Sequence, residues 1–155
     1  MRYATSPAGE SIACCLLGKG PPIVVVPSGP WTVIQAQQQV STWWAWNTRL
    51  AARRLVVLYD LIGTGLSSVS DDGPHFGLDQ QVDDLKAVVS SLALPPVTLF
   101  AAQHAGPAAI KFAALQPDMV THLVLWGTYA RRRLLRRNTV TGHPRGNAAR
   151  LGSVH

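Results

Sequence analysis

"LFAAQHAGPAAIKFAALQPDMVTHLVLWGT", residues 99–128, decides the fold because an alanine-rich segment joins two apolar runs within it. Residues 104–116 have the composition of a short helix, and Pro117 ends it because proline cannot continue a helix. The apolar runs on either side are typical of buried strands. The stretch therefore predicts a strand, a tight turn, a helix and a second strand.

The same alternation runs through the earlier part of the chain. Compact apolar runs rich in β-branched residues, "IVVVPSGP" and "RLVVLYD", predict two more buried strands. Helices are predicted over residues 35–52 and 79–94. Two short β-like segments, "RYATS" and "SIACCLLG", come before them. We therefore expect an α/β fold in which helices flank a mostly parallel sheet.

In such a fold the turns that follow the parallel strands gather at one edge of the sheet. Right-handed crossovers place them there, and they comprise residues 27–30, 60–68, 101–106 and 127–130. Ligands of open α/β sheets bind beyond the carboxyl ends of the strands. We expect a binding site at this edge.

The charge of the chain is very uneven along its length. The net charge is +6, yet residues 1–130 hold seven basic and eight acidic residues, while residues 131–155 hold seven arginines and no acid. We expect one domain over residues 1–130 and a disordered, basic tail over residues 131–155. The tail is open to three interpretations: it binds nucleic acid or an anionic surface, it is solvated, or it is a truncated or frame-shifted end.

The cysteines and the apolar runs bear on location and cofactors. Cys14 and Cys15 are adjacent, so on a strand they point to opposite faces and do not pair. The sequence offers no zinc-ligand cluster and no cofactor motif, and we expect neither a metal nor a cofactor. No apolar run reaches the length of a membrane span, and the N-terminus is too polar for a secretory signal. We expect a cytoplasmic protein.

Four segments in order carry a resemblance to a known family. "IVVVPSG", "VVLYDLIGTGLSS", "VTLFAAQHAGP" and "HLVLWGTYARR" resemble the N-terminal half of α/β-hydrolase-fold proteins, over roughly residues 2–132. The most similar branch is bacterial, and its hydrolase-like domain is sometimes joined to a nucleotide-cyclase or transcription-regulator domain. The resemblance implies hydrolysis of an ester-like or acyl substrate.

The resemblance also implies roles for two loops. It assigns Ser28 and Gly29 to the oxyanion hole, and Asp60, Gly63, Gly65 and Ser67 fit the family's loop pattern of aspartate, glycines and serine. We expect Asp60 to fix its loop through backbone hydrogen bonds and Ser28 to act by hydrogen bonding, not as a nucleophile. Ile62 stands where the family pattern has arginine, so a polar anchor of that loop is missing.

The tight turn resembles the nucleophile elbow of this family, but it has no serine. Small residues two before and two after the apex place Gln103 there, between Ala101 and Ala105. A register shifted by one residue places His104 there instead. The Gly-Pro pair at residues 106–107 favours the first register, and a glutamine amide is neither a nucleophile nor a useful general base.

The other members of a catalytic triad are not identifiable either. In this family the acid and the histidine follow later in the chain, and we expect neither His143 nor His155 to act as that histidine. We expect His104 to be a polar residue at a helix N-terminus, with no catalytic role, because its partners are absent. Four of the five tryptophans lie within residues 31–46 and either line a ligand pocket or pack in the core.

Four functions follow from these observations. The first is a truncated, catalytically impaired hydrolase, or pseudoenzyme, with a degenerate elbow. The second is a small-molecule binding module that uses the residual cleft. The third is a hydrolase completed by a partner chain or by an unconventional nucleophile, and the fourth is nucleic-acid binding through the tail. An exposed sheet edge would also favour self-association.

Overall fold

A computed structural model describes residues 1–69, 73 and 76–130. The predicted tail, residues 131–155, with its arginines and both of its histidines, lies outside the described residues. The strands are β1 Arg2–Thr5, β2 Ser11–Leu17, β3 Pro22–Val26, β4 Leu55–Tyr59, β5 Val97–Ala102 and β6 Val120–Trp126. The helices are α1 Ile34–Gln39, α2 Ser41–Ala51, α3 Leu78–Ser91 and α4 Gly106–Leu115, with short 3₁₀ turns η1 Gln103–Ala105 and η2 Pro117–Met119.

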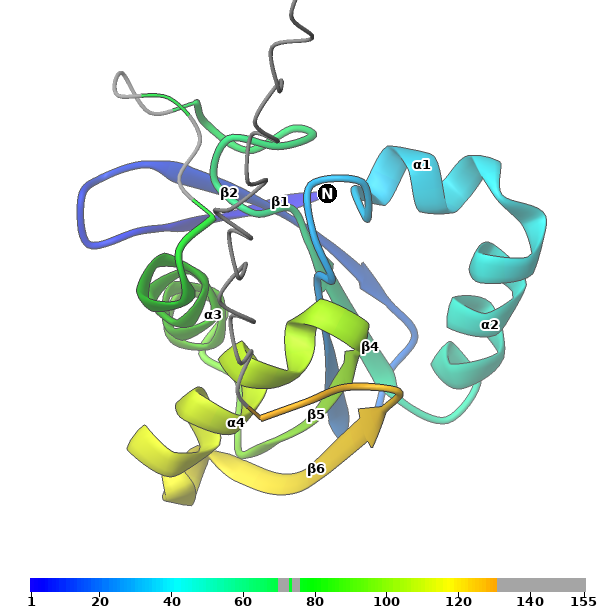
Figure 1. Ribbon diagram of the computed structural model, residues 1–155. Coiled ribbons are helices and arrows are strands. Elements are labelled where there is room, and N and C mark those ends of the chain that lie inside the picture. The colour runs from blue at the N-terminus through cyan, green and yellow to red at the C-terminus, as the bar shows by residue number, and fades with distance from the viewer. Residues whose placement is uncertain (70–72, 74–75, 131–155) are drawn as a thin grey trace, which may run out of the picture.

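All six strands form one sheet in the order β1-β2-β4-β3-β5-β6. β1 and β2 are antiparallel, and β4, β3, β5 and β6 run parallel. Figure 1 shows α1 and α2 on one side of the sheet and α3 and α4 on the other. The predicted α/β fold with a mostly parallel, helix-flanked sheet is confirmed. No helix of the described residues has the length and hydrophobicity to cross a membrane.

The side chains of β2 show how the two faces of the sheet form separate cores. Cys14 packs in the larger core with residues of α3 and α4, and Cys15 packs in the smaller one with Ile34 and Leu50 on the opposite face. The expectation that the two thiols point to opposite faces is therefore confirmed, and both are free. Burial raises the pKa of Cys14 to about 11, so this thiol is protonated near neutral pH.

The single helix predicted over residues 35–52 is wrong in one respect, because two helices occupy this segment. Val40 has φ −91° and ψ 102°, which is extended, and it separates α1 from α2. Its carbonyl still accepts the N–H of Trp44 at 3.0 Å, so α2 begins at once. A β-branched residue tolerates this extended conformation well, and the break lets α1 and α2 meet the sheet at different angles.

β6 forms one edge of the sheet and is far more exposed than the inner strands. Its last four residues are large and apolar, and their side chains are 36% to 71% exposed: Leu123, Val124, Leu125 and Trp126. The strand carries no charged residue that would deter pairing with another strand. Within the described residues, β6 therefore presents an uncovered apolar edge.

Candidate functional site

The turn between β5 and α4 contains a strained residue at its apex. Gln103 has φ +50°, and Ala93 is the other non-glycine residue with positive φ among the described residues. Ala101 and Ala105, two positions before and after it, are fully buried. A left-handed conformation costs a residue with a Cβ about 1–2 kcal/mol, so the surrounding packing must hold Gln103 in place.

Thr128, just after β6, secures this turn. Its hydroxyl donates a hydrogen bond to the Gln103 carbonyl. A Cβ at Gly106 would overlap the Thr128 side chain, so only glycine permits this approach at the start of α4. The apex is therefore tied to the end of the neighbouring strand.

Two backbone N–H groups at the site are occupied by hydroxyls of the chain itself. The His104 N–H donates to Ser28 Oγ at 3.3 Å, and the Ser28 N–H donates to Thr32 Oγ1 at 3.0 Å. The Thr32 hydroxyl in turn donates to the Gly29 carbonyl at 2.9 Å. The N–H that follows Gln103 at the apex of the turn is therefore satisfied by a neutral hydroxyl oxygen of the chain.

Gly29 has φ +154°, and a Cβ there would meet the Trp31 ring at 2.8 Å. The glycine thus allows Trp31 to lie close over the loop. From there Trp31 approaches the His104 ring edge-on, with ring centroids 6.2 Å apart. His104 Nδ1 shares a 2.9 Å hydrogen bond with the Tyr129 hydroxyl. In the described part of the chain no carboxylate orients this histidine as a base.

Asp60 anchors two loops and does not open into the pocket. Its Oδ1 accepts the Ile34 N–H at 2.7 Å, and its Oδ2 accepts the Leu66 N–H at 3.0 Å. A Cβ at Gly65 would overlap the Asp60 carboxylate, and Gly63 has φ +84°. Burial raises the pKa of Asp60, while its two backbone hydrogen bonds lower it. These contacts give Asp60, Gly63 and Gly65 a role in shaping the loop.

Asp84 of α3 is a second buried carboxylate, and it lies outside the loop that Asp60 anchors. It is 1% exposed, and its oxygens accept the Ile62 N–H at 3.1 Å and the Gln80 side-chain amide at 2.8 Å. Burial raises the pKa of Asp84 more than these hydrogen bonds lower it. Ile62, the position where the family pattern has arginine, thus contacts this carboxylate through its backbone N–H.

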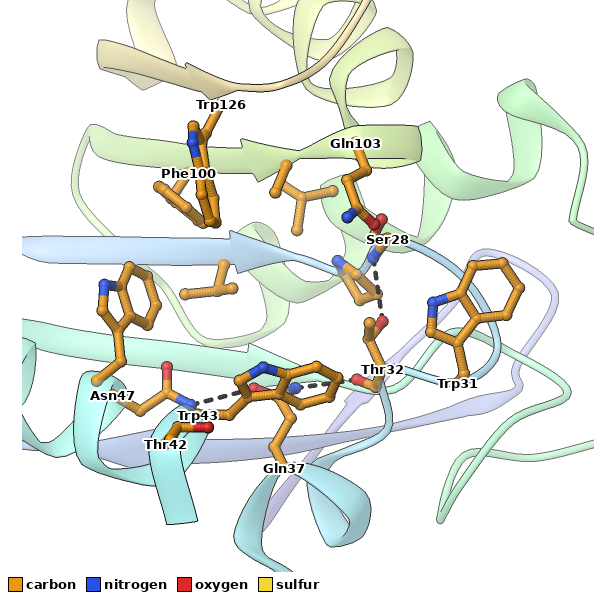
Figure 2. Close-up of a pocket in the computed structure, with 15 residues that line it drawn as sticks. Ser28, Trp31, Thr32, Gln37, Thr42, Trp43, Asn47, Phe100, Gln103 and Trp126 are labelled. Atoms are coloured by element: carbon orange, nitrogen blue, oxygen red, sulfur yellow. Dashed lines mark hydrogen bonds between the residues drawn. The ribbon is translucent and has the colours of Figure 1, made fainter. Parts of the chain in front are cut away.

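A pocket of about 510 Å³ opens beside the elbow on the α1–α2 side of the sheet (Figure 2). Gln103 and Ser28 lie at one end of it, and aromatic rings form much of its wall. Its lining residues are Val25, Val26, Pro27, Ser28, Trp31, Thr32, Gln37, Thr42, Trp43, Trp46, Asn47, Phe100, Ala102, Gln103 and Trp126. None of these side chains is ionisable, so the pocket favours an uncharged ligand.

The tryptophans divide between the two roles that the sequence left open. Trp31, Trp43 and Trp46 line the pocket, whereas Trp44 packs against the smaller core. Trp46 stacks at a tilt on Phe100 of β5, with ring centroids 4.8 Å apart. Trp126, far along the sequence on β6, joins the pocket wall. Its contribution depends on strand order and was not visible in the sequence.

A search for metal ligands within the described ranges finds no group of three histidine, cysteine or acidic side chains. The polar groups that face the pocket are amides and hydroxyls, which donate and accept hydrogen bonds without taking up a charge. The site is therefore suited to holding a neutral molecule.

No family model matches this chain. It is 31% identical over 115 residues to a 2-hydroxy-6-oxo-2,4-heptadienoate hydrolase of Pseudomonas putida, covering 72% of this chain and 38% of the relative. It is 29% identical over 131 residues to a cis-3-alkyl-4-alkyloxetan-2-one decarboxylase of Shewanella oneidensis, covering 83% of this chain and 39% of the relative. The chain thus spans less than half the length of these curated relatives.

Solved structures give a similar result. A meta-cleavage product hydrolase from Pseudomonas fluorescens superposes with a TM-score of 0.71 at 21% identity, covering 86% of this chain and 47% of that one. An α/β-hydrolase-fold protein from Burkholderia ambifaria superposes with a TM-score of 0.63 at 26% identity, covering 81% and 43%.

Proposed function

Because this chain carries the N-terminal half of the α/β-hydrolase fold, we propose that it is a catalytically impaired hydrolase-fold protein whose remaining site binds a small molecule. The observation that carries the proposal is Gln103, which takes the strained apex of the elbow without supplying a nucleophile. The turn geometry of a hydrolase is thus combined with a side chain that can only form hydrogen bonds.

The surroundings of Gln103 support the same proposal. The His104 N–H, which would stabilise a developing oxyanion, donates to Ser28 Oγ. The His104 ring is engaged with Tyr129 and has no acid to orient it within the described residues. Within the part of the chain that the structure describes, the apex supplies no nucleophile, the His104 ring has no acid partner, and one oxyanion donor is occupied.

The pocket supports the binding half of the proposal. Its volume of about 510 Å³ lies in the range of pockets that hold small organic ligands. The two curated relatives, a 2-hydroxy-6-oxo-2,4-heptadienoate hydrolase and a cis-3-alkyl-4-alkyloxetan-2-one decarboxylase, are named for different small molecules. We therefore infer that the pocket takes a small organic ligand, without assigning the relatives' substrates to it.

Hydrolysis of p-nitrophenyl acetate tests the catalytic half. We expect no turnover above background from the wild-type chain or from Gln103→Ser, because restoring a hydroxyl alone supplies neither base nor free oxyanion donor. Gln38→Ser, at an exposed position of α1, is the control for adding a serine elsewhere. Wild-type turnover that His104→Ala abolishes would contradict the proposal. Turnover gained by Gln103→Ser but not by Gln38→Ser would show that the nucleophile alone is lost, which contradicts the proposal that the base and an oxyanion donor are lost as well.

The remaining expectations stay predictions. Completion of the site by a partner chain would appear as esterase activity only in the presence of that chain. Nucleic-acid binding through residues 131–155 would survive 0.2 M salt and disappear when those residues are deleted. A cytoplasmic location rests on the two unpaired cysteines, and self-association rests on the exposed β6 edge.

A further inference from the structure

Asn47 is the buried polar residue of the pocket wall. It lies on α2 and lines the pocket together with Trp46 of the same helix and Phe100 of β5, and it is 1% exposed. Among the described residues its side-chain oxygen has no hydrogen-bond partner. Figure 2 shows this oxygen directed away from Gln37. A buried acceptor without a donor is destabilising, so its retention in a pocket wall calls for a function.

A chain of hydrogen bonds fixes which atom of Asn47 is left free. The Thr32 carbonyl can only accept, so the Gln37 Nε2 amide must face it, and it does so at 2.9 Å. Gln37 Oε1 therefore faces Asn47 and accepts from its Nδ2 at 3.1 Å. This leaves Asn47 Oδ1 as the free group. Flipping Asn47 would set its oxygen against Gln37 Oε1, two acceptors. Flipping Gln37 would set its oxygen against the Thr32 carbonyl and its amide nitrogen against Asn47 Nδ2, so the hydrogen bonds fix both orientations.

The walls around this acceptor define the rest of the ligand. Trp43, Trp46, Phe100 and Trp126 are aromatic, and no lining side chain from the described ranges is ionisable. Flat apolar rings stack favourably on such walls, whereas a charged group would lose its hydration without gaining a counter-charge. The complementary molecule is neutral and aromatic.

We propose that the pocket binds a neutral aromatic molecule that carries a hydroxyl or N–H donor, and that Asn47 Oδ1 accepts the hydrogen bond from that donor. The proposal rests on the ligand-binding role proposed above and adds the class of ligand and the residue that selects it. Because Asn47 is almost fully covered, the donor must reach it past Trp43 and Trp46, two pocket residues that are 47% and 39% exposed.

Isothermal titration calorimetry with 2-naphthol and 2-methoxynaphthalene tests the proposal. The two probes share one ring system, and only the first has a donor. We expect the wild-type chain to bind 2-naphthol about tenfold more tightly, the ratio that one hydrogen bond to a buried amide provides. In Asn47→Leu, which keeps the side-chain volume but removes the acceptor, this ratio should fall to about one. Gln38→Leu, the same type of change on the exposed face of α1, should leave it unchanged.

The possible results separate the two proposals. Equal binding of both probes by the wild-type chain would overturn the role of Asn47 while leaving the pocket as a binding site. Binding of neither probe would overturn the ligand-binding function itself. If Asn47→Leu does not fold, as thermal unfolding by circular dichroism would show, Asn47→Ala replaces it, and the ratio of the two affinities should again fall to about one.

Discussion

The backbone N–H of His104 donates to the side-chain hydroxyl of Ser28, 3.3 Å away, across 76 positions of sequence. This contact joins the elbow to the loop after β3, and the Ser28 N–H extends it to Thr32. The two loops are therefore coupled, and the coupling should be measurable as a free energy.

Ser28→Ala removes the acceptor of one hydrogen bond and should lower the free energy of unfolding by about 0.5–1.5 kcal/mol. Thr32→Val removes a hydroxyl that makes two, and should lower it by at least as much. The double variant should lose less than the sum, by about 0.5 kcal/mol or more, because both residues belong to one network. Urea denaturation measures all three variants, and Ser90→Ala at an exposed position of α3 is the control. Strict additivity would show that the Ser28 and Thr32 hydroxyls act independently.

Gln103→Gly should leave stability unchanged or raise it by up to about 1 kcal/mol, because glycine adopts positive φ without the cost that a Cβ imposes. The same type of change at Ala114, on the exposed side of α4, should lower stability by about 1 kcal/mol. Thermal unfolding of both variants checks the contrast. A loss at residue 103 as large as that at residue 114 would mean that the Gln103 side chain makes stabilising contacts.

Asp84→Asn should stabilise the protein at pH 8 and have little effect near pH 4. Burial raises the pKa of Asp84, so the folded state binds a proton more tightly than the unfolded state does. Stability is then highest below the pKa of an unfolded aspartate, near 3.9, and falls as pH rises through the raised folded value. Asparagine removes this dependence, and the Gln80 amide can rotate to accept from it.

Urea denaturation of Asp84→Asn across this pH range measures the effect, with the exposed Asp83→Asn as control. Ile62→Arg should also stabilise the protein at pH 8, because a cation close to Asp84 favours the charged form of its carboxylate. Destabilisation by Asp84→Asn at pH 8 would indicate that the ionised carboxylate is held favourably by Ile62 and Gln80.

The β6 edge should mediate self-association. An apolar edge strand without charged residues is open to pairing with a second strand, and a lysine on it blocks such pairing. Light scattering after size-exclusion chromatography should show association of the wild-type chain that increases with concentration. Val124→Lys should shift it toward the monomer. Leu115→Lys, at a similarly exposed apolar position on α4, should not. A monomeric wild-type chain at all concentrations would contradict the prediction.

Features encoded by local pattern could be predicted from the sequence. The apolar runs that became β3, β4 and β5 are continuous, and the small residues around Gln103 marked a sharp turn before any tertiary contact was known. The break at Val40 was missed because composition predicted helix on both sides of it. One extended residue between two helical segments hardly changes the composition of the segment as a whole.

Features that depend on the meeting of distant segments were not visible in the sequence. Trp126 reaches the pocket because β6 lies beside β5, and the free oxygen of Asn47 follows from contacts with two other segments. The bond between His104 and Ser28 likewise requires the order of strands to be known. Composition and spacing carry no information about such pairings.

The adjacent thiols of Cys14 and Cys15 give the molecule two built-in reporters. One sulfur is shielded beneath α3 and α4, and the other lies on the face covered by α1 and α2. Burial raises the pKa of both, so each reacts with a thiol reagent only when its own layer separates from the sheet. The labelling rates of single-cysteine variants would therefore report, layer by layer, which side of the protein opens first.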